Sequence, residues 1–186
     1  MAQLDYRLRA SAKMSQGGVI VVTESPFSDV LTANKIYSAT YQYGDLKGRA
    51  MKGLAVLTCM DSRIDPLGMM GLSPGDAKIL RNAGARVTED VLRTLVLGAY
   101  LLGVTRVMIV AHTDCRMTVQ NEDAVHRAVA EAGGPDTRSL SFMTTSDLCE
   151  SLAQDVQKIR SSPYLNNLQV GGFIYHLDSG HLEETP

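Results

Sequence analysis

Two apolar runs of the chain are each followed by side chains that can bind a metal or hold a proton. The run LAVLT is followed by Cys59, Asp61 and Arg63, and the run RVMIVA is followed by His112 and Cys115. Two thiolates and one imidazole form a ligand set that suits zinc. The spacing therefore predicts a zinc site built from two separate segments of the chain.

The number of ligands distinguishes two kinds of zinc site. If the Asp61 carboxylate coordinates with the other three side chains, the shell is closed and the zinc is structural; if it stays off, the fourth position is open and the site is catalytic. Arg63 favours the catalytic interpretation, because a guanidinium two residues after the carboxylate can hold Asp61 away from the metal in a bidentate pair. A structural zinc is the alternative.

Both apolar runs have the character of buried strands. They are short, rich in Val, Leu and Ile, and not alternating, as in strands that are covered on both faces of a parallel sheet. A helical segment separates them, so the unit is strand, helix, strand. Parallel neighbours place their carboxyl ends at one edge, where ligands bind in open α/β sheets, and we expect the polar side chains to meet there.

The helix between these strands has clear end signals. Thr88 is a good N-cap, and Gly103 stands where the residue after the last turn belongs, so we expect a helix over 91–102. Leu97, Tyr100 and Leu101 add apolar surface outside its main stripe. This helix is therefore either deeply buried or packed against a second subunit.

The rest of the chain predicts an α/β domain with a mainly parallel central sheet flanked by helices. A Gly directly after an expected strand at 77–81 indicates either a close backbone approach within 82–85 or a simple loop there. Other expected elements are a strand at 17–23, a helix at 30–43, helical turns at 64–71, a turn at 73–76, helices at 124–132 and 146–160, and strands at 169–177 and 181–182. We expect a single zinc-binding catalytic domain over 27–186, preceded by an arm or tail at 1–26.

Composition narrows the class of protein. The 186 residues suffice for one domain with a real core, and the net charge of -2 gives no broad basic surface for nucleic acid or anionic membrane. No apolar run approaches the roughly 20 residues of a membrane helix, and none suits a signal peptide, so we expect a cytoplasmic protein. Three cysteines do not form a disulfide framework.

Cys149, on the apolar side of a helix, is expected to be buried.

Three motifs resemble those of the β-class carbonic anhydrases, particularly the short bacterial members. They are CMDSR at 59–63, RNAGA at 81–85 and HTDC at 112–115. The resemblance extends with less specificity from Phe27 to Pro186. It implies a parallel-sheet α/β fold, a zinc held by two Cys and one His, an Asp-Arg dyad beside it, and a homodimer or higher homo-oligomer.

Mapped by motif, the zinc ligands are Cys59, His112 and Cys115, and the catalytic dyad is Asp61 with Arg63. The implied activity is zinc-dependent reversible hydration of carbon dioxide to bicarbonate by metal-hydroxide attack. The alternatives are a carbonyl sulfide or carbon disulfide hydrolase on the same fold and a non-catalytic zinc-stabilised binding protein.

Four further expectations concern the surroundings of the site. Asp61 is expected to become a fourth zinc ligand in a closed state at low pH and to return to Arg63 at higher pH, so that activity rises through roughly pH 7 to 9. Arg116 stands where the family commonly has Gly; this cation either narrows the entrance and changes how anions bind, or points to solvent. Asp114 is expected to be solvated, and Asp65 is a candidate partner of Arg81.

Overall fold

The computed structural model describes residues 25–118 and 121–185, so the strand expected at 17–23 and most of the arm expected at 1–26 lie outside the described residues. The chain divides between Asp45 and Leu46 into two compact units. The described part of the first unit contains helix α1, Ser28–Ala39, none of whose residues is buried. That residues 27–186 form a single domain stays a prediction.

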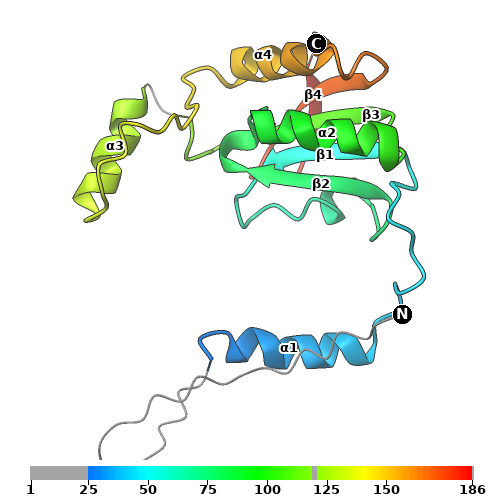
Figure 1. Ribbon diagram of the computed structural model, residues 1–186. Coiled ribbons are helices and arrows are strands. Elements are labelled where there is room, and N and C mark those ends of the chain that lie inside the picture. The colour runs from blue at the N-terminus through cyan, green and yellow to red at the C-terminus, as the bar shows by residue number, and fades with distance from the viewer. Residues whose placement is uncertain (1–24, 119–120, 186) are drawn as a thin grey trace, which may run out of the picture. The chain divides into compact units, whose positions relative to one another are not determined.

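The second unit is built on one five-stranded sheet. Its strands are β1 (Leu54–Cys59), β2 (Ala77–Asn82), β3 (Arg106–His112), β4 (Gln169–Tyr175) and β5 (Leu182–Thr185). The order is β2-β1-β3-β4-β5. The pairings among β2, β1, β3 and β4 are parallel (Figure 1), and β4 pairs with β5 in the antiparallel direction. The predicted mainly parallel sheet is therefore confirmed, and so is the tight turn into a final strand.

Two helices cover one face of this sheet. Helix α2, Glu89–Leu101, contributes Leu95 to the core, and helix α4, Leu148–Arg160, contributes Ile159; both are at most 1% exposed and pack with strand residues such as Ile109. Burying each such side chain stabilises the fold by roughly 1.5–3 kcal/mol. The opposite face is covered by the segment around a single 3-10 turn, Gly68–Met70, where the sequence predicts helical turns.

Helix α2 has the N-terminal and C-terminal caps that the sequence predicts. The Thr88 hydroxyl accepts a hydrogen bond from the Val91 amide at 3.3 Å, and Gly103 adopts a φ of +76° just beyond the C-cap, a conformation that favours glycine. Leu97, Tyr100 and Leu101 are 44%, 66% and 65% exposed. Deep burial, one of the two alternatives for this helix, is therefore wrong for these three side chains.

After β3 the chain leaves the sheet and forms a helical segment. It contains α3, Glu122–Glu131, which begins at its Asn121 cap. Glu122 accepts a hydrogen bond from the Ser141 hydroxyl at 2.9 Å and another from the Met143 amide, and these bonds lower the pKa of Glu122. The Met143 carbonyl in turn accepts from Arg86 Nη1 at 2.8 Å, so the return loop is tied to the core.

Helix α4 corrects one prediction. Cys149 is exposed, because it lies in the first turn and the buried stripe begins only at Ser151. Asp155 occupies the stripe as a charged residue, 4% exposed, with its Oδ2 atom 2.6 Å from Arg86 Nε.

No helix in the described ranges is long and apolar enough to cross a membrane.

Candidate metal centre

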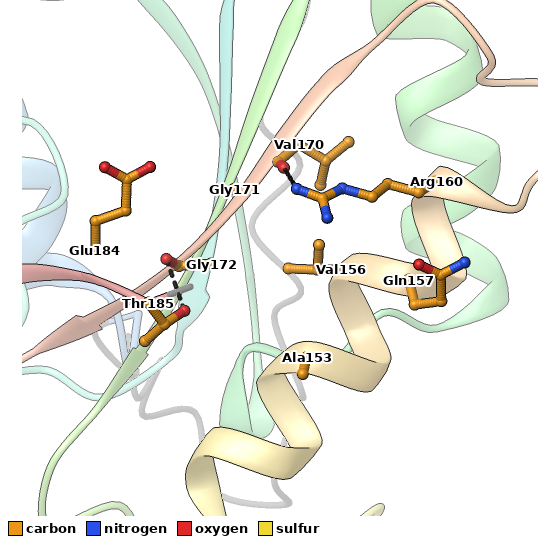
Figure 2. A pocket seen from close by; sticks show the side chains of 9 residues that line it. All are labelled: Ala153, Val156, Gln157, Arg160, Val170, Gly171, Gly172, Glu184 and Thr185. Carbon is orange, nitrogen blue, oxygen red and sulfur yellow. Dashed lines mark hydrogen bonds between the residues drawn. The ribbon is translucent and has the colours of Figure 1, made fainter.

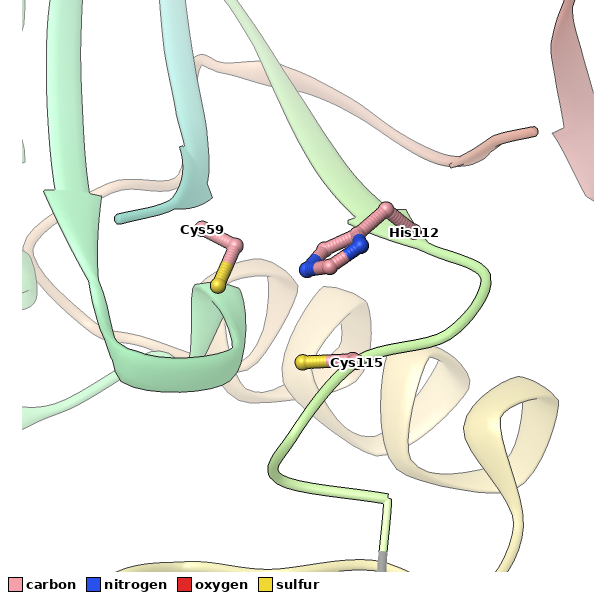
Figure 3. Close-up of side chains that lie close together, drawn as sticks. All are labelled: Cys59, His112 and Cys115. Atoms are coloured by element: carbon pink, nitrogen blue, oxygen red, sulfur yellow. The ribbon is translucent and has the colours of Figure 1, made fainter. Parts of the chain in front are cut away.

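The parallel pairing brings Cys59, His112 and Cys115 together. Cys59 is the last residue of β1, His112 is the last residue of β3, and Cys115 follows three residues later. One ligand atom from each lies within 4.8 Å of the other two, and Figure 3 shows the three side chains pointing toward one another. The three side chains therefore meet at the carboxyl edge of the sheet, as expected. Their role as metal ligands stays a prediction.

The histidine has the tautomer that a metal requires. His112 Nδ1 lies 2.8 Å from the Thr113 carbonyl oxygen, which can only accept, so Nδ1 carries the proton and Nε2 keeps its lone pair. Nε2 is buried and finds no hydrogen-bond partner in the described part of the chain. A buried acceptor left without a partner is costly, and a cation between Nε2 and the two sulfurs would satisfy it.

The two sulfurs also fit a soft divalent metal. Tetrahedral zinc places thiolate ligands about 3.8 Å apart, which is compatible with the observed cluster. Burial raises the pKa of the Cys115 thiol, and the nearby Cys59 raises it further. A bound cation would reverse this effect by stabilising the thiolates. The donor set therefore fits zinc.

A backbone amide approaches the Cys59 sulfur. Gly84, in the 3-10 turn Ala83–Ala85 after β2, donates its N–H to Cys59 Sγ at 3.4 Å. Its φ is +78°, and a Cβ there would lie 3.2 Å from the Cβ of Met117. The close backbone approach predicted for 82–85 is confirmed, and its partner is a candidate ligand.

The Arg81 side chain donates hydrogen bonds to backbone carbonyl groups at the end of β1 and just beyond it. Its Nε donates to the Cys59 carbonyl at 2.9 Å, and its Nη2 donates to the Asp61 carbonyl at 2.6 Å. The suggested pair of Arg81 with Asp65 is wrong, because Asp65 instead accepts from the amides of Leu67 and Gly68. Arg81 thus fixes the backbone from which two site side chains project.

Asp61 and Arg63 form the predicted bidentate pair. Arg63 Nε donates to Asp61 Oδ1 at 3.0 Å, Nη2 donates to Oδ2 at 2.8 Å, and the Arg63 amide adds a bond to Oδ1 at 2.9 Å. The Arg63 side-chain bonds, followed by the amide bond, hold the pKa of Asp61 well below its usual value. Asp61 is therefore ionised and engaged by Arg63 in this structure; its movement to a metal stays a prediction.

The same guanidinium binds Asp114. Arg63 Nη1 lies 2.7 Å from Asp114 Oδ2, and Nη2 donates to the Asp114 carbonyl at 3.2 Å. Asp114 adopts a φ of +55°, which turns the chain between His112 and Cys115. Its side chain is 80% exposed, as expected, but it is paired rather than merely solvated. Arg63 therefore links the two segments that carry the cluster.

A cavity of about 350 Å³ opens beside the cluster. Its lining consists of Asp61, Arg63, Asp114, Cys115, Arg116 and Thr118. The Thr118 amide N–H donates to the Cys115 carbonyl at 3.0 Å. This bond closes a turn in which Cys115, Arg116 and Thr118 all line the cavity. Arg116 lines this cavity and is exposed to solvent, and its narrowing of the entrance stays a prediction.

A larger cavity, of about 640 Å³, lies between α4 and strands β4 and β5. Figure 2 shows Arg160 donating to the Val170 carbonyl at its rim and Glu184 beyond the strands. Its lining contains no Cys or His and shares no residue with the metal-ligand cluster. Of these two cavities, only the smaller is lined by a member of the candidate metal-ligand cluster, Cys115.

Comparison with known proteins establishes the family. The carbonic anhydrase family model matches residues 54–182, which include every residue of the candidate centre. The chain is 32% identical over 160 residues to β-carbonic anhydrase 1 of Mycobacterium tuberculosis, covering 84% of this chain and 96% of that protein. A carbonic anhydrase structure from Streptococcus mutans matches with a TM-score of 0.82 and 32% identity, over 88% of this chain and 99% of that one.

The chain therefore belongs to the β-carbonic anhydrase family. A related protein with another name also matches: the carbon disulfide hydrolase of Acidithiobacillus thiooxidans is 29% identical over 150 residues, covering 69% of this chain and 75% of that protein. The predicted resemblance and the predicted fold class are confirmed.

Proposed function

We propose that this protein catalyses the reversible hydration of carbon dioxide to bicarbonate. The observation that carries the proposal is the cavity that exposes both the Asp61–Arg63 pair and Cys115 of the metal-ligand cluster. A zinc ion held by Cys59, His112 and Cys115 would lower the pKa of a bound water and so supply a nucleophile at moderate pH.

Asp61 is arranged to orient that nucleophile. Its Oδ1 atom already accepts two hydrogen bonds from Arg63, whereas Oδ2 accepts one. A carboxylate oxygen offers about two acceptor sites, so Oδ2 keeps one for a hydrogen atom of an incoming water. Because its pKa is lowered, Asp61 stays an acceptor and does not donate. It can therefore turn the hydrogen of the water toward itself and leave an oxygen lone pair for the carbon of the substrate.

A second candidate is hydrolysis of carbon disulfide. The match to a carbon disulfide hydrolase over 69% of this chain supports it, because the same donor set and dyad would suit either substrate. Stopped-flow hydration of carbon dioxide and sulfide release from carbon disulfide, measured on one preparation, distinguish the two. We expect rapid hydration and little sulfide release; the reverse would support the hydrolase, and zinc with neither activity would support a binding protein.

We further propose that the protein is a homodimer or a higher homo-oligomer. The proposal is supported by Leu97, Tyr100 and Leu101, three large apolar side chains that remain exposed along α2. Static light scattering should give at least twice the chain mass of 20.1 kDa. A monomer of that mass with full activity would contradict this proposal.

A further inference from the structure

The charges around the smaller cavity do not balance without Arg116. Arg63 is already engaged by two carboxylates, with Asp61 Oδ2 at 2.8 Å and Asp114 Oδ2 at 2.7 Å. These three side chains together carry two negative charges and one positive charge. On their own they would give the cavity an excess of negative charge and disfavour the approach of an anion.

Arg116 supplies the missing positive charge. It is exposed and lines the same cavity, and no hydrogen bond or ion pair joins its side chain to residues 25–118 or 121–185. Its guanidinium therefore differs from that of Arg63, whose donors are used by Asp61 and Asp114. A planar group of this kind can form two parallel hydrogen bonds with a carboxylate-like anion.

We propose that Arg116 is an anion-binding residue that holds bicarbonate, and competing small monovalent anions, at the mouth of this cavity. This inference rests on the proposed function, since bicarbonate is the charged product of that reaction and carbon dioxide is neutral. The guanidinium favours the anion over the neutral substrate by charge. Arg116 therefore affects mainly the KM and kcat measured with bicarbonate, and inhibition by anions.

The kinetic signature follows from the fixed equilibrium between carbon dioxide and bicarbonate. At one pH, a variant must change kcat/KM in both directions by the same factor. Loss of a contact made to bound bicarbonate therefore raises KM and kcat for dehydration together and leaves kcat/KM for hydration nearly unchanged. A residue that only supported the fold would not produce this pattern.

The test compares Arg116→Gln, which removes the charge, with Arg116→Lys, which keeps it. Arg127→Gln is the matched control, because Arg127 is an exposed arginine that lines a different cavity. Each zinc-loaded protein is assayed at pH 7.5 and constant ionic strength for KM and kcat of bicarbonate dehydration and for nitrate inhibition of hydration. Nitrate binding is also measured without turnover, from the nitrate-dependent rise of the unfolding midpoint.

Arg116→Gln should raise the KM of bicarbonate and the inhibition constant of nitrate by about two- to fivefold, the range expected for one exposed charge contact. It should also weaken the stabilisation by nitrate. Arg116→Lys keeps the charge but not the bidentate geometry and should fall between the parent and Arg116→Gln, whereas Arg127→Gln should not differ from the parent. Unchanged anion constants in Arg116→Gln, or equal losses in the Gln and Lys variants, would overturn the proposal.

The two proposals can fail separately. If the protein hydrates carbon dioxide and Arg116→Gln binds nitrate as the parent does, the anion site is refuted and the proposed function stands. If hydration is absent but nitrate stabilises the parent and not Arg116→Gln, the anion site stands and the proposed function is refuted.

Discussion

Replacing Arg63 with alanine removes the side-chain contacts that orient Asp61 while leaving the candidate metal ligands in place. Asp61 loses its bonds from Nε and Nη2, at 3.0 and 2.8 Å, and keeps only the bond from the amide of residue 63. The loop carrying Asp114 loses two more bonds. A catalytic group displaced by about 1 Å costs on the order of 100-fold in rate, so we expect a loss of that size in kcat.

The freed carboxylate is then expected to move toward the metal and occupy its fourth position. Stability should change little, because Arg63 is half exposed and surface ion pairs contribute little. Arg93→Ala is the matched control, since it removes another exposed pair, Arg93 with Asp90 at 2.6 Å, from helix α2. Arg63→Lys keeps the charge without the bidentate geometry and should fall between alanine and the parent.

The assay is stopped-flow hydration of carbon dioxide between about pH 7 and 9, on samples with measured zinc content, together with a crystal structure of Arg63→Ala. We expect one zinc per chain, low activity, and Asp61 on the metal. Hydration by Arg63→Ala at the parental rate across this pH range would show that Arg63 does not orient Asp61 for catalysis.

Three further changes test other parts of the structure. Cys59→Ser should lose most of its zinc while Cys149→Ser, at an exposed cysteine, keeps it; equal zinc in both would refute the ligand assignment. Asp155→Ala should lower the free energy of unfolding by about 3 kcal/mol in urea titrations, because it leaves the mostly buried Arg86 guanidinium, 13% exposed, without its carboxylate partner; a loss near zero would contradict this. The lowered pKa of Glu122 means that its contribution is present above its ordinary value of 4.5 and is lost as pH falls through the folded-state value. The protection factors of amides in 134–145, measured by hydrogen exchange and corrected for the intrinsic rate at each pH, should fall on acidification below pH 4.5 in the parent and not in Glu122→Gln; identical profiles would refute the role of this carboxylate.

Much of the fold follows from local sequence signals. The strands β1 and β3 are predicted by short apolar runs, and α2 is predicted by the cap at Thr88 and the glycine at 103, because each signal lies within the element that it defines. The meeting of Cys59 with His112 follows from parallel pairing alone. Topology therefore locates the candidate centre before any side-chain contact is known.

The contacts that the sequence does not predict join distant residues. Arg63 and Asp114 are 51 positions apart, and no local pattern indicates that one guanidinium binds both Asp61 and Asp114. The sequence makes Arg81 a candidate partner for the Asp65 carboxylate, but Arg81 binds backbone carbonyl groups, which carry no sequence signature. Cys149 is exposed because tertiary packing, and not helical periodicity alone, decides where the buried stripe begins.

The most direct test of the proposed zinc-dependent activity is a zinc titration of the metal-depleted protein, followed by stopped-flow hydration of carbon dioxide at each step. We expect activity to rise in proportion to bound zinc and to stop rising at about one zinc per chain, since Cys59, His112 and Cys115 form one cluster. One zinc bound per chain with hydration no faster than the uncatalysed reaction would contradict the proposed function.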